Sequence, residues 1–246
     1  MVRRTEYLEM LQKWKDEQVI KVITGIRRCG KSTLLSMYQQ ELRAQGVGED
    51  QIIYLNFEEL EHEDLLNYKS LYSHIKARLH PEKTTYIFLD EIQQVEGFQK
   101  AVDSLYVKPG VDLYITGSNA YLLSGELATL LSGRYVEINM LPLSFGEFCR
   151  MKDGGDRDAL LGEYMRNGGY PYLVKLSDDA EKVDMYLEGI YNTILVKDIE
   201  ERQRRRETDP NKRKITDLSL LKNISKFLAS SVGSPVSVKS IADYIT

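Results

Sequence analysis

Cysteine is scarce in this chain, long apolar runs are missing, and neither sign of charge dominates. The 246 residues include two cysteines, Cys29 and Cys149, and neither lies in a C-x-x-C or histidine-adjacent spacing that would indicate metal or redox work. No run approaches the roughly 18 apolar residues that span a bilayer, and the charged start is not followed by the apolar segment of a signal peptide. We therefore expect reduced thiols, a cytoplasmic location and no membrane partner.

The charge balance gives no overall electrostatic field that would favour nucleic acid, and composition alone neither supports nor excludes DNA binding. Lysine and arginine number 33 against 37 aspartates and glutamates, which gives a formal net charge of −4. Any contact with DNA must then come from a local basic patch. A content of 42% hydrophobic and 28% charged residues is typical of a globular protein, and the length suits one large or two modest domains.

A glycine-rich segment behind an apolar run is the most informative feature that is present. Residues 19–24 look like a strand, and they are followed by Gly25, Ile26, Arg27, Arg28, Cys29, Gly30, Lys31, Ser32 and Thr33. The pattern G-x-x-x-x-G-K-S curls the backbone so that its N–H groups converge on a phosphate, and the following helix adds the positive end of its dipole. Lys31 would reach the β- and γ-phosphates of ATP, and the Ser32 hydroxyl would ligate Mg²⁺. The alternative is a chance glycine–lysine turn.

Two carboxylates end another apolar strand. Asp90 and Glu91 follow residues 86–89, and the carboxyl ends of parallel strands are where α/β proteins bind ligands. We expect Asp90 to hold Mg²⁺, directly or through water, and Glu91 to polarise the attacking water as general base. An acidic pair at a strand end can also be merely solvated, so the catalytic interpretation depends on the phosphate loop.

Alternating strand-like and helical patterns predict a parallel sheet covered on both faces. We expect strands at 19–24, 51–57, 85–89, 112–116 and 135–140, and helices near 32–45, 65–79, 98–106 and 120–131. Beyond Pro142 the alternation stops, and helical periodicity runs to about residue 206 with one break at 167–171. The predicted domains are a nucleotide-binding α/β domain at 1–141, a helical lid at 142–207 and a partial helix-turn-helix region at 208–246.

Small polar side chains follow the fourth predicted strand. Ser118 and Asn119 stand where they could touch the γ-phosphate or orient the water, and they enter our list of catalytic candidates. The same Gly-Ser-Asn segment is also ordinary turn chemistry.

In combination these motifs resemble an AAA+ ATPase. The closer resemblance is to prokaryotic predicted ATPases whose AAA domain precedes a conserved C-terminal domain of unknown function, related to the signal-transduction ATPases; it extends over nearly the whole chain. Segments 115–118, 131–134, 141–148 and 168–171 match that group's landmarks. The resemblance implies a P-loop NTPase fold with a five-stranded parallel sheet in the order 5-1-4-3-2, a helical lid, and the start of a winged-helix unit within a longer protein.

The same resemblance gives two further residues a role. Arg134 stands where an AAA+ arginine finger projects into a neighbouring subunit's ATP site, which implies a homo-oligomer; the alternative is a surface arginine that ends a helix. Pro171 matches the proline that lies against adenine in signal-transduction ATPases, and the alternative is a plain helix break. No lid arginine stands in a sensor 2 setting, which leaves open whether the lid closes on the γ-phosphate.

The C-terminal region bears on partners. Its basic cluster at 202–206 and 212–214 is diluted by nearby acids, a pattern more typical of a solvated helix end than of a DNA site. Residues 237–246 resemble the first helix of a helix-turn-helix with Ser237 as N-cap, so DNA or protein could bind through this region. Two functions remain: an ATPase that drives a conformational change, which Glu91 favours, and a nucleotide-gated switch with negligible turnover.

Overall fold

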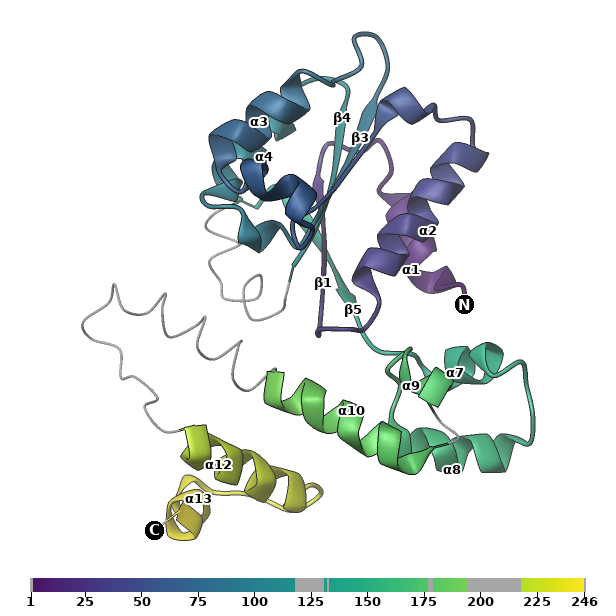
Figure 1. Cartoon of the computed structure of the whole chain (residues 1–246), viewed down its shortest axis with the longest axis vertical. Coiled ribbons are helices and arrows are strands. Elements are labelled where there is room, and N and C mark those ends of the chain that lie inside the picture. Colours follow the sequence, from purple (N-terminus) through teal and green to yellow (C-terminus); the bar gives the residue numbers. More distant parts are fainter. Residues whose placement is uncertain (1, 118–130, 132, 177–178, 194–217, 246) are drawn as a thin grey trace. The chain divides into compact units, whose positions relative to one another are not determined.

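The computed structural model describes residues 2–117, 131, 133–176, 179–193 and 218–245 (Figure 1). The chain divides into two compact units, Met1–Ala180 and Glu181–Thr246. Within the described ranges no helix has both the length and the apolar character needed to cross a bilayer. The predicted helix at 120–131 lies almost entirely outside the described residues.

A parallel sheet forms the centre of the first unit. Its five strands in the described residues follow the order β2-β3-β4-β1-β5, which confirms the predicted order 5-1-4-3-2. Each strand pairs in parallel with its neighbours. The strands are β1 (Ile20–Gly25), β2 (Ile52–Asn56), β3 (Thr85–Asp90), β4 (Val111–Thr116) and β5 (Tyr135–Met140). Strands β1 and β3 are buried along their whole length, as expected where helices cover both faces of a parallel sheet.

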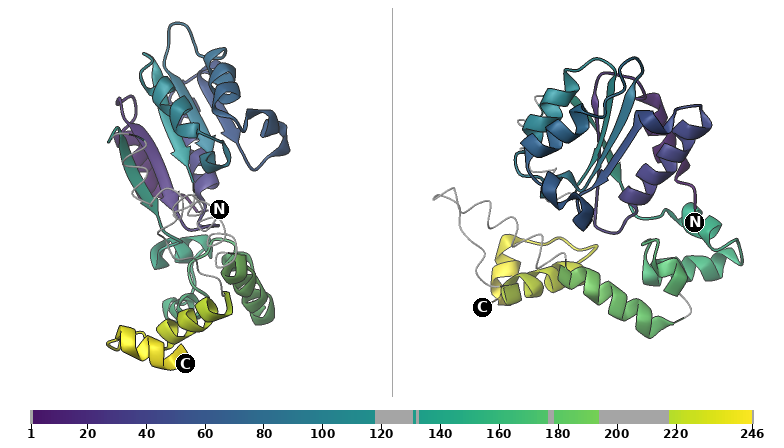
Figure 2. Two further views of the ribbon diagram at one scale, coloured as in Figure 1. Left: turned by 90° about the vertical axis from the view of Figure 1, so that its left-hand side faces the viewer. Right: turned by 45° about the horizontal axis from the view of Figure 1, so that its top comes forward.

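Two pairs of helices cover the two faces of this sheet (Figures 1 and 2). On one face lie α1 (Thr5–Lys13) and α2 (Lys31–Ala44), which pack around the buried rings of Tyr38, Phe88 and Tyr114. On the other face lie α3 (Tyr68–Lys76) and α4 (Phe98–Tyr106). The sequence analysis did not predict α1.

Short 3₁₀ turns link several elements: η1 (Glu49–Gln51), η2 (Leu60–Leu65) and η3 (Ile92–Gln94). The helix expected at 65–79 is therefore shorter than predicted. Asn67 is the N-cap of α3, because its side chain accepts from the backbone N–H of Lys69 at 2.9 Å.

Helices replace strands after β5, as predicted. The first unit continues with α7 (Phe145–Met151), α8 (Arg157–Asn167) and α9 (Leu173–Leu176). The prediction of a single break at 167–171 is wrong, because another break separates α7 from α8. There Asp153, Gly154 and Gly155 take φ angles of 58°, 86° and 137°, which end a right-handed helix.

The second unit is helical in its described residues. It contains nearly all of α10 (Ala180–Thr193), then α12 (Leu218–Ser230) and α13 (Val238–Ile245). The rings of Phe227 and Tyr244 lie 4.7 Å apart and join α12 to α13. Ser237 caps α13 as predicted, because its hydroxyl accepts from the backbone N–H of Ser240 at 3.0 Å.

Candidate active site

The glycine-rich loop leaves the carboxyl end of β1 and turns directly into α2. Gly25 has φ +152°, and a Cβ there would lie 2.4 Å from the carbonyl oxygen of Met140 and 2.9 Å from Sγ of Cys29. Only glycine fits that position. Gly30, at φ +105°, is the N-cap of α2, and Arg28 also takes a left-handed angle of 65°. The loop is thus curled as the motif predicts.

The start of α2 suits an anion. Its N-cap is a glycine, so no side chain caps the first backbone N–H groups. Ser32 and Thr33 are exposed in this first turn, whereas Cys29 is buried in the loop. Burial raises the pKa of the Cys29 thiol, so it stays protonated and inert. Uncapped amides, the helix dipole and a nearby lysine together fit a chain of phosphates.

Lys31 and Glu91, predicted as phosphate ligand and general base, lie next to each other. The Nζ atom of Lys31 is 3.7 Å from Oε1 of Glu91. It also donates to the backbone oxygens of Gly25 at 3.2 Å and Ile26 at 3.5 Å. Both side chains are largely buried. The fold therefore brings the two motifs, about 60 residues apart in sequence, into one site.

Asp90 is held from two neighbouring strands. Its side chain is fully buried; the Thr116 hydroxyl on β4 donates to Oδ1, and the Tyr54 hydroxyl on β2 donates to Oδ2 at 3.1 Å. Burial and the charge of Asp90 raise the pKa of Tyr54 well above its ordinary value, which keeps that phenol a donor. The sequence analysis gave Tyr54 no role and included Thr116 only within the segment 115–118. The signal for each is a polar group in an apolar strand next to the acidic one.

Glu91 occupies an unusual backbone position. Its φ and ψ are 54° and 45°, a left-handed conformation that costs on the order of 1–3 kcal/mol for a residue other than glycine and is frequent at functional sites. Its backbone N–H donates to the Thr116 hydroxyl at 2.9 Å, and the Gln93 amide donates to its Oε2. Thr116 therefore contacts both acidic residues at once, and Gln93 is a further residue that the motifs do not reveal.

A third acid reaches the phosphate loop. Glu58 follows β2, and its Oε1 lies 3.8 Å from Nη1 of Arg27. Burial raises the pKa of Glu58, and the negative charges of Glu91 and Asp90 add to that effect while Arg27 opposes it. The sequence did offer a signal for Glu58. It directly follows the predicted strand 51–57, just as Asp90 directly follows the predicted strand 85–89.

Arg134 lies at the opposite end of the sheet. In the parallel register Tyr135 pairs with Ile20 and Met140 pairs with Gly25, so Arg134 lies roughly 20 Å along the strands from the phosphate loop of its own chain. Its guanidinium lies over the Tyr106 ring, 5.4 Å from the centroid. The site of one chain does not include it.

Pro171, in contrast, lies beside the phosphate loop. A Cβ built on Gly30 would be 4.0 Å from Cγ of Pro171. The preceding Gly169 accepts from the backbone N–H of Leu143 at 2.7 Å, and a Cβ on Gly169 would lie 2.3 Å from the Leu143 carbonyl oxygen. The glycine is thus required for this close approach. The other candidates, Ser118 and Asn119, lie outside the described residues.

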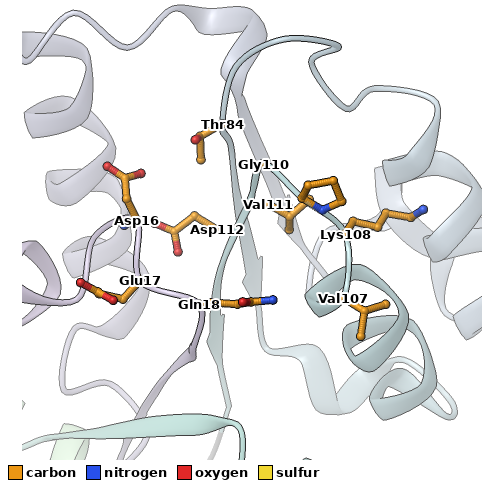
Figure 3. Close-up of a pocket in the computed structure, with 10 residues that line it drawn as sticks. Asp16, Glu17, Gln18, Thr84, Val107, Lys108, Gly110, Val111 and Asp112 are labelled. Atoms are coloured by element: carbon orange, nitrogen blue, oxygen red, sulfur yellow. Dashed lines mark hydrogen bonds between the residues drawn. The ribbon is translucent and has the colours of Figure 1, made fainter.

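A cavity of about 350 Å³ opens away from this site (Figure 3). Its lining includes Asp16, Thr84, Lys108 and Asp112. Thr84 immediately precedes β3, so the cavity lies at the amino ends of the strands. Asp112 is paired with the buried Lys21, and burial nevertheless raises its pKa. The motifs do not reach this cavity, which we therefore do not assign to nucleotide.

Two parts of the chain match known protein families. Residues 17–149, more than half of the chain, match a family described as an AAA domain, and residues 158–246 match a domain of unknown function (DUF8612). An uncharacterised protein of Haemophilus influenzae is 42% identical over 251 residues, which cover 100% of this chain and 60% of that protein. An uncharacterised protein of Methanocaldococcus jannaschii is 32% identical, covering 92% and 50%.

The chain thus spans 60% and 50% of the length of these relatives. Among solved structures, a Walker-type ATPase of Pyrococcus abyssi aligns with a TM-score of 0.57 at 14% identity, covering 100% of this chain and 89% of the other. At that identity the likeness shows the fold alone, a P-loop NTPase. From its motifs, its sheet order and the family match, the chain belongs to the AAA-domain family of AAA+ ATPases, with a C-terminal domain of unknown function.

Proposed function

We propose that this chain binds ATP with Mg²⁺ at the loop from Gly25 to Thr33 and hydrolyses it to ADP and phosphate to move its helical lid. The observation that carries the proposal is the 3.7 Å approach of Lys31 to Glu91 beside Asp90, whose carboxylate is fixed by two hydroxyl donors. Phosphoryl transfer needs positioning and charge stabilisation more than covalent chemistry, and this cluster provides both.

Each residue has a distinct task in this proposal. The first amides of α2 and the Lys31 ammonium bind the phosphates, and Ser32 and Asp90 are the residues that would hold Mg²⁺. When bound there, the ion would neutralise charge on the phosphate oxygens. Glu91 accepts a proton from the attacking water as general base. Pro171 lies close enough to Gly30 to contact the base of the same nucleotide.

A nucleotide-gated switch with slow turnover is the second candidate. Gln93 donates to one oxygen of Glu91 and Lys31 pairs with the other. A carboxylate whose two oxygens are both engaged by neighbouring side chains is not free to turn toward an attacking water until those contacts rearrange. If they persist with ATP bound, the protein holds nucleotide rather than consuming it.

The finer assignments complete the proposal. Arg134 lies far from its own phosphate loop, so it would act on the ATP site of a second copy in a homo-oligomer. Ser118 and Asn119 would orient the water or contact the γ-phosphate. We keep the division at 1–141, 142–207 and 208–246 as a functional one, with DNA or protein bound through the segment 208–246 as part of a winged helix.

The decisive experiment measures ATP binding and steady-state phosphate release with Mg²⁺. Glu91→Gln should keep ATP binding and lose turnover, whereas Lys31→Ala should lose binding. Glu96→Gln, an exposed acid nearby, serves as the matched control and should behave as wild type. Wild-type ATP affinity in Lys31→Ala would overturn the site assignment. Tight binding with negligible turnover in the wild type, with and without DNA, would favour the switch.

A further inference from the structure

Arg4 is a buried arginine just before α1, and it contacts three separate segments of the first unit. It is 4% exposed. Its Nη1 donates to the backbone oxygen of Cys29 at 3.4 Å, and its Nη2 donates to that of Leu141 at 2.8 Å. Its Nε lies 2.8 Å from Oε1 of Glu147. The residue lies outside the range that matches the AAA family, which begins at residue 17.

These contacts join the phosphate loop to the first helix after the sheet. Cys29 belongs to the loop itself, Leu141 follows β5, and Glu147 lies in α7. Glu147 is rigidly placed, because its Oε2 accepts from the backbone N–H of Ser144 at 2.9 Å in a capping box. One guanidinium thus connects the two ends of residues 141–147 to the loop.

Tyr7 reinforces the same junction. Its ring lies under the Arg4 guanidinium, with 4.8 Å between Cζ and the ring centroid. Its hydroxyl accepts from the backbone N–H of Leu141 at 3.1 Å. Arg4 and Tyr7 therefore bind the backbone carbonyl oxygen and the backbone N–H of Leu141, the first residue after β5.

The segment after β5 is also held from its other side. Leu143 donates to Gly169 at 2.7 Å and accepts from the Tyr164 hydroxyl at 2.8 Å. Close to that contact, Pro171 approaches Gly30. The residues between β5 and α7 thus lie between two connections to the phosphate loop, one through Arg4 and one through Pro171.

We infer that Arg4 is a positioning residue that couples the phosphate loop to α7, so that ATP affinity and the state of α7 depend on each other. A buried charge is tolerated only while it stays paired. Movement of Glu147 away from Arg4 would leave the guanidinium without its carboxylate partner. It is therefore energetically favourable for the phosphate loop and α7 to move together. The inference rests on the proposed binding of ATP and adds to it a residue and a route of regulation.

The test compares two adjacent arginines. Arg4→Met removes the buried charge but keeps a long apolar stem, and Arg3→Met is the matched control, because Arg3 is 69% exposed and pairs only at the surface with Glu41. ATP affinity is measured by titration calorimetry with Mg²⁺. Arg4→Met should bind ATP at least about tenfold more weakly, since a charge-assisted hydrogen bond to the loop is lost. Arg3→Met should stay within about twofold of wild type.

A second readout separates coupling from simple structural support. Hydrogen exchange of the α7 amides should slow when ATP is added to the wild type and to Arg3→Met, and should not respond in Arg4→Met. Glu147→Gln, which can still accept from Ser144, should give the same loss of response. If Arg4→Met does not fold, Glu147→Gln decides by the same two measurements.

Three results would overturn the inference. One is a folded Arg4→Met with a lower melting temperature but the ATP affinity and α7 response of the control. Another is a wild-type response in Glu147→Gln. The third is failure of the wild-type chain to bind ATP, which would also overturn the proposed function. If the wild type and both arginine variants bind ATP normally, the inference about Arg4 fails while the proposed ATP binding stands.

Discussion

Removing the Thr116 hydroxyl should disturb both acidic residues of the site together. That hydroxyl donates to Asp90 and accepts from the backbone N–H of Glu91, and the threonine is fully buried. Thr116→Val keeps the size and branching of the side chain but makes neither hydrogen bond. The Glu91 amide is then left without its partner, and one oxygen of Asp90 loses its donor.

The magnitude follows from these two contacts. A hydrogen bond to a charged group contributes about 1.5–3 kcal/mol, and an unsatisfied buried amide costs about 1–3 kcal/mol. Allowing for local relaxation, we expect the free energy of unfolding to fall by about 2–4 kcal/mol, which lowers the melting temperature by roughly 5–15 °C. If hydrolysis depends on the geometry of Asp90 and Glu91, kcat should fall roughly 10- to 100-fold with KM little changed.

Urea unfolding and steady-state ATP turnover measure the two effects. Thr116→Ser keeps the hydroxyl and should recover most of kcat. Thr24→Val is the matched control, because Thr24 is an equally buried threonine at the end of β1 whose hydroxyl donates to Glu137 at 2.7 Å, away from Asp90. The reasoning is refuted if Thr116→Val unfolds and turns over ATP no differently from Thr24→Val.

Three further changes test other parts of the structure. Lys21→Met leaves the buried Asp112 charge without its partner and should lower the free energy of unfolding by about 3–5 kcal/mol in urea titrations; a loss below about 1 kcal/mol would show that the pair is not desolvated. Burial raises the pKa of Cys29, so iodoacetamide at pH 8 should label half-buried Cys149 and spare Cys29 until the protein unfolds, as peptide mass spectrometry would show; rapid native labelling of Cys29 contradicts this. Arg134→Ala should bind ATP normally, hydrolyse it poorly, and regain activity when mixed with a variant that cannot bind ATP but keeps its arginine; no recovery in confirmed mixed assemblies rules out action between subunits.

The sequence by itself determined the parts of this protein that local chemistry specifies. The apolar run before Gly25 and the following glycine–lysine pattern specify a strand, a curled loop and a helix start within a few residues, and the structure forms each of them there. Strand β5 and helix α4 begin and end where the periodicity places them. The sheet order came from the resemblance to AAA+ ATPases, because nothing local in a strand specifies its neighbour.

Only the tertiary structure decided what surrounds the candidate catalytic residues. Tyr54 and Thr116 reach Asp90 across 36 and 26 positions of sequence, and Arg4 reaches Leu141 across 137. Such partners leave no local pattern. The local sequence around a hydroxyl in a strand, or around an arginine near a terminus, is the same whether that side chain faces water or a buried carboxylate. Which one it faces depends on how parallel strands align and where α1 packs, and that is set by burial of the apolar surface over the whole sheet.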